Sequence, residues 1–141
     1  PKKTPPKSRR IQDKTVLVLV SDNQAALRKR SSKGLLAGLY ELPNLEGHLN
    51  SDQVLDYVKA EGLSPIRIQE LPAAKHIFSH IEWHMAGYVV KVEEPEQQEH
   101  DPSDAPDSPG KLFFVEKQQM EETYSIPAAF AAYTEYFKHR Y

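Results

Sequence analysis

Cysteine is absent from the 141 residues. Its absence excludes disulfides, zinc sites built on thiolates and cysteine-ligated iron–sulfur clusters within this chain. It also fits a reducing compartment. No apolar run approaches the roughly 20 residues that a membrane-spanning helix needs, and no secretory signal pattern is present. We therefore expect no membrane partner.

Proline is in excess, with eleven residues that cluster at the start and near position 100. Residues 1–34 hold ten Lys or Arg against two acids, whereas residues 93–107 hold seven acids and no Lys or Arg. A basic, proline-rich stretch buries too little apolar surface to order itself. We predict an interdomain linker over residues 1–13, one domain over residues 14–141, and an acidic loop at about 93–110. Because the chain starts with proline, we expect a piece of a longer protein.

The pattern of apolar residues predicts strands, one helix, more strands and a closing helix. Thr15–Val20 is a β-branched and leucine run typical of a strand buried on both faces. Asn50 and Gln53 have the spacing of a capping box, and Gly62 suits a helix stop, so we predict a helix over Ser51–Glu61. Further strands are predicted over Gln24–Arg30, Pro65–Leu71, Ala73–Phe78, Ile81–Val92 and Lys111–Glu116, with a short strand before Pro43 and a closing helix from Pro127. This order predicts an α+β domain with layers.

Two motifs carry a resemblance to a known family. The segment KGLLAGLYELP (Lys33–Pro43) is similar to the opening of the C-terminal Nudix-like, or MutT-like, domain of MutY-type adenine DNA glycosylases. In the family a tryptophan and a phenylalanine stand at Tyr40 and Leu42. About thirty-five residues later, His76–His80 (HIFSH) matches the H-x-F-[ST]-H loop of the same domain. The resemblance extends over roughly residues 15–141, and the basic start is similar to the family's interdomain connector.

The resemblance implies a Nudix-like α/β/α layered fold with a mixed, largely antiparallel sheet and two main helices. It also implies a DNA-repair domain that recognises 8-oxoguanine opposite adenine in duplex DNA. Adenine excision would belong to a separate N-terminal glycosylase domain with a 4Fe-4S cluster, so we expect this piece to be non-catalytic and to hold no cofactor. The expected partners are double-stranded DNA with an 8-oxoguanine:adenine mismatch and that glycosylase domain. We expect a monomer, located in the cytoplasm and on the nucleoid if the source is bacterial.

The residues of the second motif have chemistry that suits a damaged purine. 8-Oxoguanine carries a hydrogen on N7 and a carbonyl at C8, whereas guanine N7 is an acceptor. The hydroxyl of Ser79 can accept or donate, Phe78 can stack on a base or wedge between base pairs, and His80 can donate to a phosphate or a base edge. Phe78 could equally be a core residue, and His80 a hydrogen-bonded residue at a strand end. Arg30 and Lys33 are possible phosphate contacts, or charges on a solvated hairpin edge.

Several alternatives remain open. A Nudix hydrolase needs a glutamate cluster, R-E-U-x-E-E-x-G-U, to hold magnesium. Aligned on Gly62, the tandem glutamates of that pattern fall on Lys59 and Ala60, and only Asp56 keeps a carboxylate. A serine nucleophile at Ser79 lacks the G-x-S-x-G elbow. The four-residue spacing of His76, His80 and His84 would form a metal site on a helix but not on the predicted strand. A protein-interaction module that uses the acidic loop is the remaining alternative.

Overall fold

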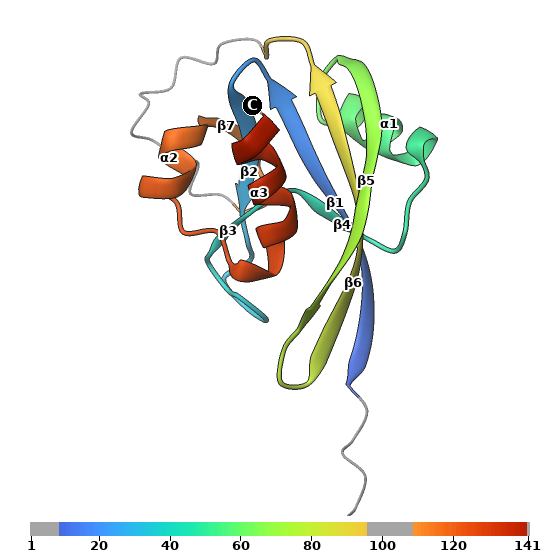
Figure 1. Ribbon diagram of the computed structural model, residues 1–141, viewed down its shortest axis with the longest axis vertical. Coiled ribbons are helices and arrows are strands. Elements are labelled where there is room, and N and C mark those ends of the chain that lie inside the picture. The colour runs from blue at the N-terminus through green and yellow to red at the C-terminus, as the bar shows by residue number, and fades with distance from the viewer. Residues whose placement is uncertain (1–8, 96–108, 141) are drawn as a thin grey trace, which may run out of the picture.

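The computed structural model describes residues 9–95 and 109–140. Figure 1 shows its elements in chain order. The strands are β1 (Arg10–Ser21), β2 (Gln24–Lys29), β3 (Tyr40–Glu41), β4 (Asn44–Glu46), β5 (Pro65–Ile77), β6 (Ile81–Val92) and β7 (Phe113–Glu116). The helices are α1 (Ser51–Ala60), α2 (Lys117–Glu122), the short 3-10 helix η1 (Ala128–Phe130) and α3 (Ala131–Arg140).

All seven strands belong to one mixed sheet, ordered β3-β2-β1-β6-β5 along its main path. β4 pairs with β1 and β7 pairs with β2 off this path. β1 and β6 run parallel over eleven residue pairs, and the other pairings are antiparallel. The prediction of a mixed, largely antiparallel sheet is confirmed.

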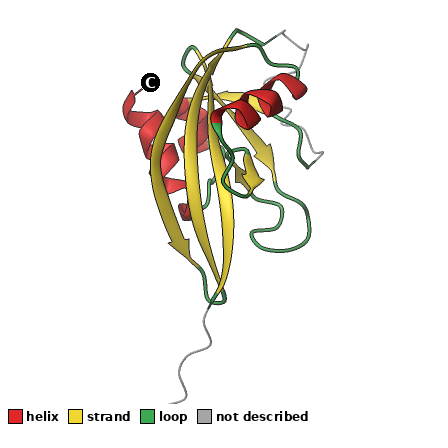
Figure 2. Cartoon of the chain, turned by 90° about the vertical axis from the view of Figure 1, so that its right-hand side faces the viewer, coloured by secondary structure: helices red, strands yellow, loops and turns green. Residues whose placement is uncertain are grey.

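Helices cover both faces of the sheet, as Figure 2 shows from the side. Val16, Val18 and Val20 of β1 pack into the cluster beneath α2, η1 and α3. Leu17 and Leu19 alternate with them and pack into the cluster beneath α1. These five side chains are at most 1 % exposed, so the predicted doubly buried strand and the α/β/α layering are confirmed. We call the two sides of the sheet the α3 face and the α1 face.

Helix α1 forms where its capping residues predicted it. The Asn50 side chain accepts from the Gln53 backbone N–H at 2.9 Å, and the Gln53 side chain accepts from the Asn50 N–H at 2.9 Å. These bonds satisfy two of the donors that a helix start leaves open. Gly62 takes a φ of +82° beyond the last turn. This left-handed conformation costs least for glycine, because it has no Cβ.

β5 differs from the sequence prediction. Two strands separated at Pro72 were predicted, but β5 is continuous, with a register shift between Leu71 and Ala74. Proline cannot donate to a strand ladder, and an edge strand with a bulge is where it is tolerated. The Tyr133 hydroxyl of α3 donates to the Pro72 carbonyl at 3.0 Å. The prediction of a break was therefore wrong, because a bulge and a distant tyrosine accommodate the proline.

The C-terminal region also differs in detail. Pro127 precedes the 3-10 helix η1 rather than starting an α-helix, and α3 begins at Ala131. Phe130, Tyr133 and Phe137 of this region are at most 1 % exposed and pack into the core. Helix α2 was not predicted, because six residues are too few to show a helical period.

Two predicted segments lie at the margin of the described residues. β1 begins at Arg10, so the last four residues assigned to the linker belong to a strand. Residues 1–8 of the linker and residues 96–108 of the acidic loop lie outside the described residues. Within the residues that are described, no helix has the length and apolar character needed to cross a membrane.

Candidate nucleic-acid interface

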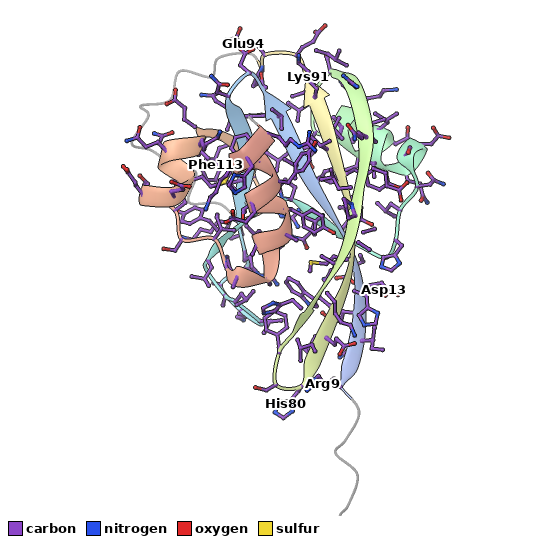
Figure 3. All side chains as sticks on the ribbon, in the orientation of Figure 1. Arg9, Asp13, His80, Lys91, Glu94 and Phe113 are labelled. Atoms are coloured by element: carbon purple, nitrogen blue, oxygen red, sulfur yellow. The ribbon has the colours of Figure 1, made fainter. Side chains whose placement is uncertain are left out.

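The lower parts of β1, β5 and β6 extend past the helices that cover the rest of the sheet (Figures 1 and 2). We call this extension the blade, and define it as Arg10–Asp13, 75–77 and 81–84. Its tip is the turn Phe78–His80 between β5 and β6. Figure 3 shows His80 at the far end of the blade, away from all three α-helices.

Backbone hydrogen bonds hold the tip. The Phe78 N–H donates to the Ile81 carbonyl at 2.7 Å, which closes the turn. The Arg10 N–H at the start of β1 donates to the His80 carbonyl at 3.0 Å. The tip is therefore tied both to its own hairpin and to a strand that lies far away in the sequence.

Phe78 points back into the domain. Its ring is half-buried and meets the Trp83 ring edge to face at 5.0 Å and the His76 ring at 4.8 Å between centroids. Trp83 is 1 % exposed and packs in turn against Phe130 at 5.5 Å. Of the two interpretations of Phe78 in the sequence, this conformation corresponds to the core residue and not to a wedge presented to solvent. Each such aromatic contact stabilises by about 0.5–1.5 kcal/mol beyond area burial.

Ser79 and His80 have the opposite environment. Both are exposed, and they are the two residues of the turn that follow the anchored Phe78. A hydroxyl and an imidazole at the end of a projecting hairpin can reach an extended partner such as a duplex. The HIFSH motif thus combines an inward aromatic residue with an outward polar pair.

Arg30 is engaged inside the domain. Its guanidinium forms an ion pair with Glu41, donates from Nε to the Leu35 carbonyl at 3.0 Å, and lies 5.5 Å from the centre of the Trp83 ring. Its side chain is 18 % exposed. In this conformation the Arg30 guanidinium, which was predicted to contact a phosphate, is already paired with groups of the protein.

Glu41 is the acceptor at the centre of this network. It is 3 % exposed, and it also accepts from Arg28 Nε at 2.8 Å and from Asn44 Nδ2 at 2.9 Å. A buried carboxylate needs such partners, because an unpaired buried charge is costly. Together these bonds join β2, β3 and the start of β4, which explains the acidic residue within the GLYELP segment.

The loop of the first motif, residues 31–39, bends back on itself. Gly38 adopts a φ of +72°, and its N–H donates to the Ser31 carbonyl at 2.9 Å. Lys33 is exposed on this loop, unlike Arg30. Tyr40, where the family has tryptophan, meets Tyr124 edge to face at 4.7 Å. The aromatic position of the motif therefore packs in the core beneath α2.

The α1 face of the blade holds a charged cluster that sequence reasoning missed. Glu82 is near Arg9 at 3.9 Å and Lys75 at 3.6 Å, and it hydrogen-bonds His84. The bond from His84, followed by the charge of Lys75, lowers the pKa of Glu82. Glu82 and His84 are two residues apart on β6, so the alternation of a strand places them on one face. The partners from β1 and β5 could be known only from strand pairing.

Helix α1 is the helix on which the Nudix hydrolase pattern was aligned at Gly62, and its exposed residues are not the glutamates of that pattern. Asp52, Asp56 and Lys59 are exposed, and Val54 and Val58 are buried. Across residues 9–95 and 109–140, no group of three or more His, Asp or Glu residues is placed to hold a metal ion.

Two shallow hollows lie elsewhere on the described surface. One, of about 310 Å³, lies between the β5 bulge and α3 and is lined by residues such as Pro72 and Tyr136. The other, of about 410 Å³, lies between α2 and α3 beside Met120 and Lys138. No tip residue lines either hollow, so the candidate site is a projecting surface.

Comparisons with known structures agree on the fold. The C-terminal domain of mouse MUTYH, from its complex with human PCNA, superposes with a TM-score of 0.65 at 20% identity, covering 92% of this chain and 89% of that one. The NUDIX domain of Shewanella oneidensis NrtR, complexed with ADP ribose, gives 0.61 at 17% identity, covering 95% and 89%. The MutT NUDIX hydrolase from Burkholderia pseudomallei gives 0.59 at 18% identity, covering 88% and 96%. At these identities the likeness concerns the fold alone.

Sequence comparison provides the family. The chain has no significant match among curated protein sequences. The model of the NUDIX domain matches residues 15–136, which span β1 from Thr15 to most of α3. The chain therefore belongs to the NUDIX domain family.

Proposed function

We propose that this NUDIX domain is a DNA-repair module that reads 8-oxoguanine opposite adenine and supports adenine excision by a separate glycosylase domain. The observation that carries the proposal is the exposed Ser79–His80 pair at the end of a hairpin whose own aromatic residue is anchored in the core. A recognition site works best when rigid elements hold its contact groups. The fold likeness to the C-terminal domain of mouse MUTYH supports the same proposal.

The proposed contact uses the altered edge of the damaged base. The Ser79 hydroxyl accepts from N7–H of 8-oxoguanine, and a backbone N–H of the tip donates to the carbonyl at C8. With guanine, N7 presents a lone pair, so the hydroxyl keeps this contact only by turning its own hydrogen toward N7 and away from any other partner. C8 of guanine also offers no acceptor to the N–H of the tip, so at least one polar contact is left unpaired. Such a loss costs about 1–3 kcal/mol, or roughly 5- to 150-fold in affinity.

Under this proposal Phe78 does not act as the wedge between base pairs that the sequence suggested. Its packing on Trp83 at 5.0 Å sets the position of the two residues that follow it. We propose that it is a positioning residue, and that Ser79 and His80 make the contacts with DNA. The 4Fe-4S cluster remains an expectation for the separate glycosylase domain, since this chain has no cysteine to bind it.

The test is a comparison of duplexes that differ only in the lesion. Binding of the chain to 8-oxoguanine:adenine and guanine:adenine duplexes would be followed by NMR titration, because we expect the isolated domain to bind weakly at physiological salt. We expect Ser79→Ala to reduce the affinity ratio toward one. Ser51→Ala, an exposed serine at the start of α1, is the matched control. A ratio that Ser79→Ala leaves unchanged would count against lesion reading.

Hydrolysis of a nucleotide substrate is the second candidate, and membership of the NUDIX family favours it. Magnesium-dependent turnover of 8-oxo-dGTP would support it. The residues of α1 argue against it, because Lys59 places a cation where the hydrolase pattern needs a carboxylate ligand. Loss of any turnover in Asp56→Asn would be required to assign the activity to this helix.

A protein-interaction module is the third candidate. The mouse MUTYH domain was crystallised with PCNA, so a domain of this fold can bind a protein. Partner binding that is lost when the acids of residues 93–107 are neutralised, together with lesion selectivity that Ser79→Ala leaves unchanged, would favour this candidate. Under the first proposal, Ser79→Ala removes the selectivity and neutralising the acids does not.

A further inference from the structure

Three cations gather around the tip from strands that the sequence keeps apart. Arg10 is held against the tip by the 3.0 Å bond from its N–H to the His80 carbonyl. The parallel register of β1 and β6 pairs Arg10 with Ile81, so Arg9 lies level with the turn. Lys75 stands on β5, two residues before the end of that strand. All three residues are exposed.

These cations lie on both faces of the blade. Arg9 and Lys75 approach Glu82 on the α1 face. Residues alternate between faces along a strand, and Gln12 accepts from Trp83 Nε1 at 3.0 Å on the α3 face. Arg10 therefore emerges on the α3 face, opposite Arg9 and Lys75. The tip has positive charge on either side.

The charge near the tip is available to an anion. The Arg9 and Lys75 side chains are 46% and 56% exposed, whereas Glu82 is 14% exposed and already accepts from His84. Their approaches to Glu82, at 3.9 and 3.6 Å, are loose. Asp13, the other acid of the blade, lies 3.6 Å from His48. Arg30, by contrast, is 18% exposed and paired with Glu41.

We propose that Arg9, Arg10 and Lys75 form a phosphate clamp, which binds the DNA backbone on the two sides of the tip while Ser79 and His80 face the bases. This inference rests on the proposed function, because it takes duplex DNA as the ligand of the tip. A polyanion with phosphates on both walls of a groove complements a narrow blade with cations on both faces. The tip itself is the turn of the two-stranded β5–β6 hairpin, and a two-stranded ribbon is narrow enough to enter a major groove about 12 Å wide.

The clamp gives the domain affinity without sequence preference. Phosphate contacts fix the register and orientation of a protein on DNA, and base contacts supply specificity. Arg9, Arg10 and Lys75 thus set how tightly any duplex is held, and Ser79 sets which base is preferred. The two functions are carried by different residues of the same blade and can be separated by mutation.

The test is the salt dependence of binding. Fluorescence anisotropy with a labelled duplex would be measured over a series of salt concentrations for the full chain and for Arg10→Gln/Lys75→Gln. Each phosphate contact contributes about 0.9 to the slope of log affinity against log salt, so we expect the slope to fall by about 1.8. The loss should be equal for 8-oxoguanine:adenine and guanine:adenine duplexes. Arg10→Lys/Lys75→Arg, which keeps both charges, should restore the slope.

The matched control removes two exposed cations elsewhere. Arg67→Gln/Lys91→Gln changes the net charge equally, at two exposed positions paired across β5 and β6. Figure 3 shows Lys91 at the opposite end of the molecule from His80. If both double variants lower the slope equally, the effect is one of net charge and the clamp is wrong. Binding to polyglutamate that matches or exceeds binding to the duplex would also overturn it, because the blade would then fit an acidic protein.

Different results would overturn the phosphate clamp and the proposed recognition of 8-oxoguanine by Ser79. If Arg10→Gln/Lys75→Gln lowers the slope but the native chain does not distinguish the two duplexes, the clamp stands and lesion reading falls. If Ser79→Ala removes discrimination while the clamp variant behaves like its control, lesion reading stands and the clamp falls. Circular dichroism melting of each variant would show that the fold is retained.

Discussion

The two halves of β1 pair alike with β6 but have different surroundings, and only the upper half also pairs with β4 and β2. From Arg10 to Val20 the strand pairs with β6 without interruption. Leu17, in the upper half, is fully buried beneath α1, whereas Ile11, six residues earlier on the same face, is 56% exposed. Backbone pairing therefore continues where the helical layers stop. The difference shows that strand formation and side-chain burial are separate matters in this sheet.

The upper half supplies stability and the lower half supplies accessible groups. Apolar burial stabilises by about 25 cal/mol per Å², and it is concentrated where both faces are covered. A region with fewer buried contacts opens more easily, which makes the tethers of the tip important. Phe78 on Trp83 and Arg10 on His80 are those tethers.

Truncating one side chain in each half of β1 tests this difference in packing most directly. We expect Leu17→Ala to lower the free energy of unfolding by about 2–5 kcal/mol, because it leaves a cavity beneath α1. Ile11→Ala should change it by no more than about 0.5 kcal/mol. Urea denaturation followed by circular dichroism measures both values. Similar losses for the two variants would show that the blade is as tightly packed as the body.

A close contact between the sheet and α3 provides the next largest effect. A Cβ at Gly87 would lie 2.2 Å from Cε1 of the buried Tyr133 ring. We expect Gly87→Ala to destabilise by about 1–3 kcal/mol, because the ring and α3 must move. In a Tyr133→Ala background the same glycine change should cost much less. A full penalty in that background would locate the strain elsewhere.

Tyr133 should also make stability depend on alkaline pH. Burial raises the pKa of Tyr133 from 10.0 to about 12, so its contribution is complete below pH 10 and is lost as pH rises toward 12. Tyr133→Phe removes the bond to Pro72 and should cost about 1 kcal/mol at neutral pH. The difference between the two proteins should then fall by up to about 1.4 kcal/mol per pH unit above pH 10, so that Tyr133→Phe becomes the more stable protein before pH 12. A constant difference up to pH 12 would contradict the raised pKa.

The smallest expected effect on stability lies in the blade. The pKa of Glu82 is lowered from 4.5, so Glu82 contributes stability above the unfolded value, and that contribution is lost as pH falls through the folded value. Glu82→Gln should flatten this acid limb by lowering stability at neutral pH, and the loss should be small because the ion pairs of Glu82 with Arg9 and Lys75 are loose. By releasing Arg9 and Lys75, it should also strengthen binding to duplex DNA. Weaker binding would indicate that Glu82 positions the two cations.

Local sequence was sufficient for much of the fold. The buried strand at Thr15–Val20, the capping box at Asn50 and the alternation of β6 depend on neighbours within a few residues. The predicted break between two strands at Pro72 was wrong, because a bulge and a tyrosine from α3 accommodate the proline. The candidate site likewise depends on both local and distant residues. The HIFSH motif located the tip, but the direction of the Phe78 ring depends on Trp83.

The sequence by itself determined most of the strands, helix α1 and the closing helix, together with the family motifs and the separation of basic from acidic segments, because these are encoded in short stretches of chain. Only the tertiary structure decided which charges remain free. Arg30 is satisfied by Glu41, whereas Arg10 is brought beside His80 by the parallel pairing of β1 with β6. The physical reason is that a side chain's burial and partners are set by residues distant in sequence, and strand pairing and layer packing alone bring those residues together.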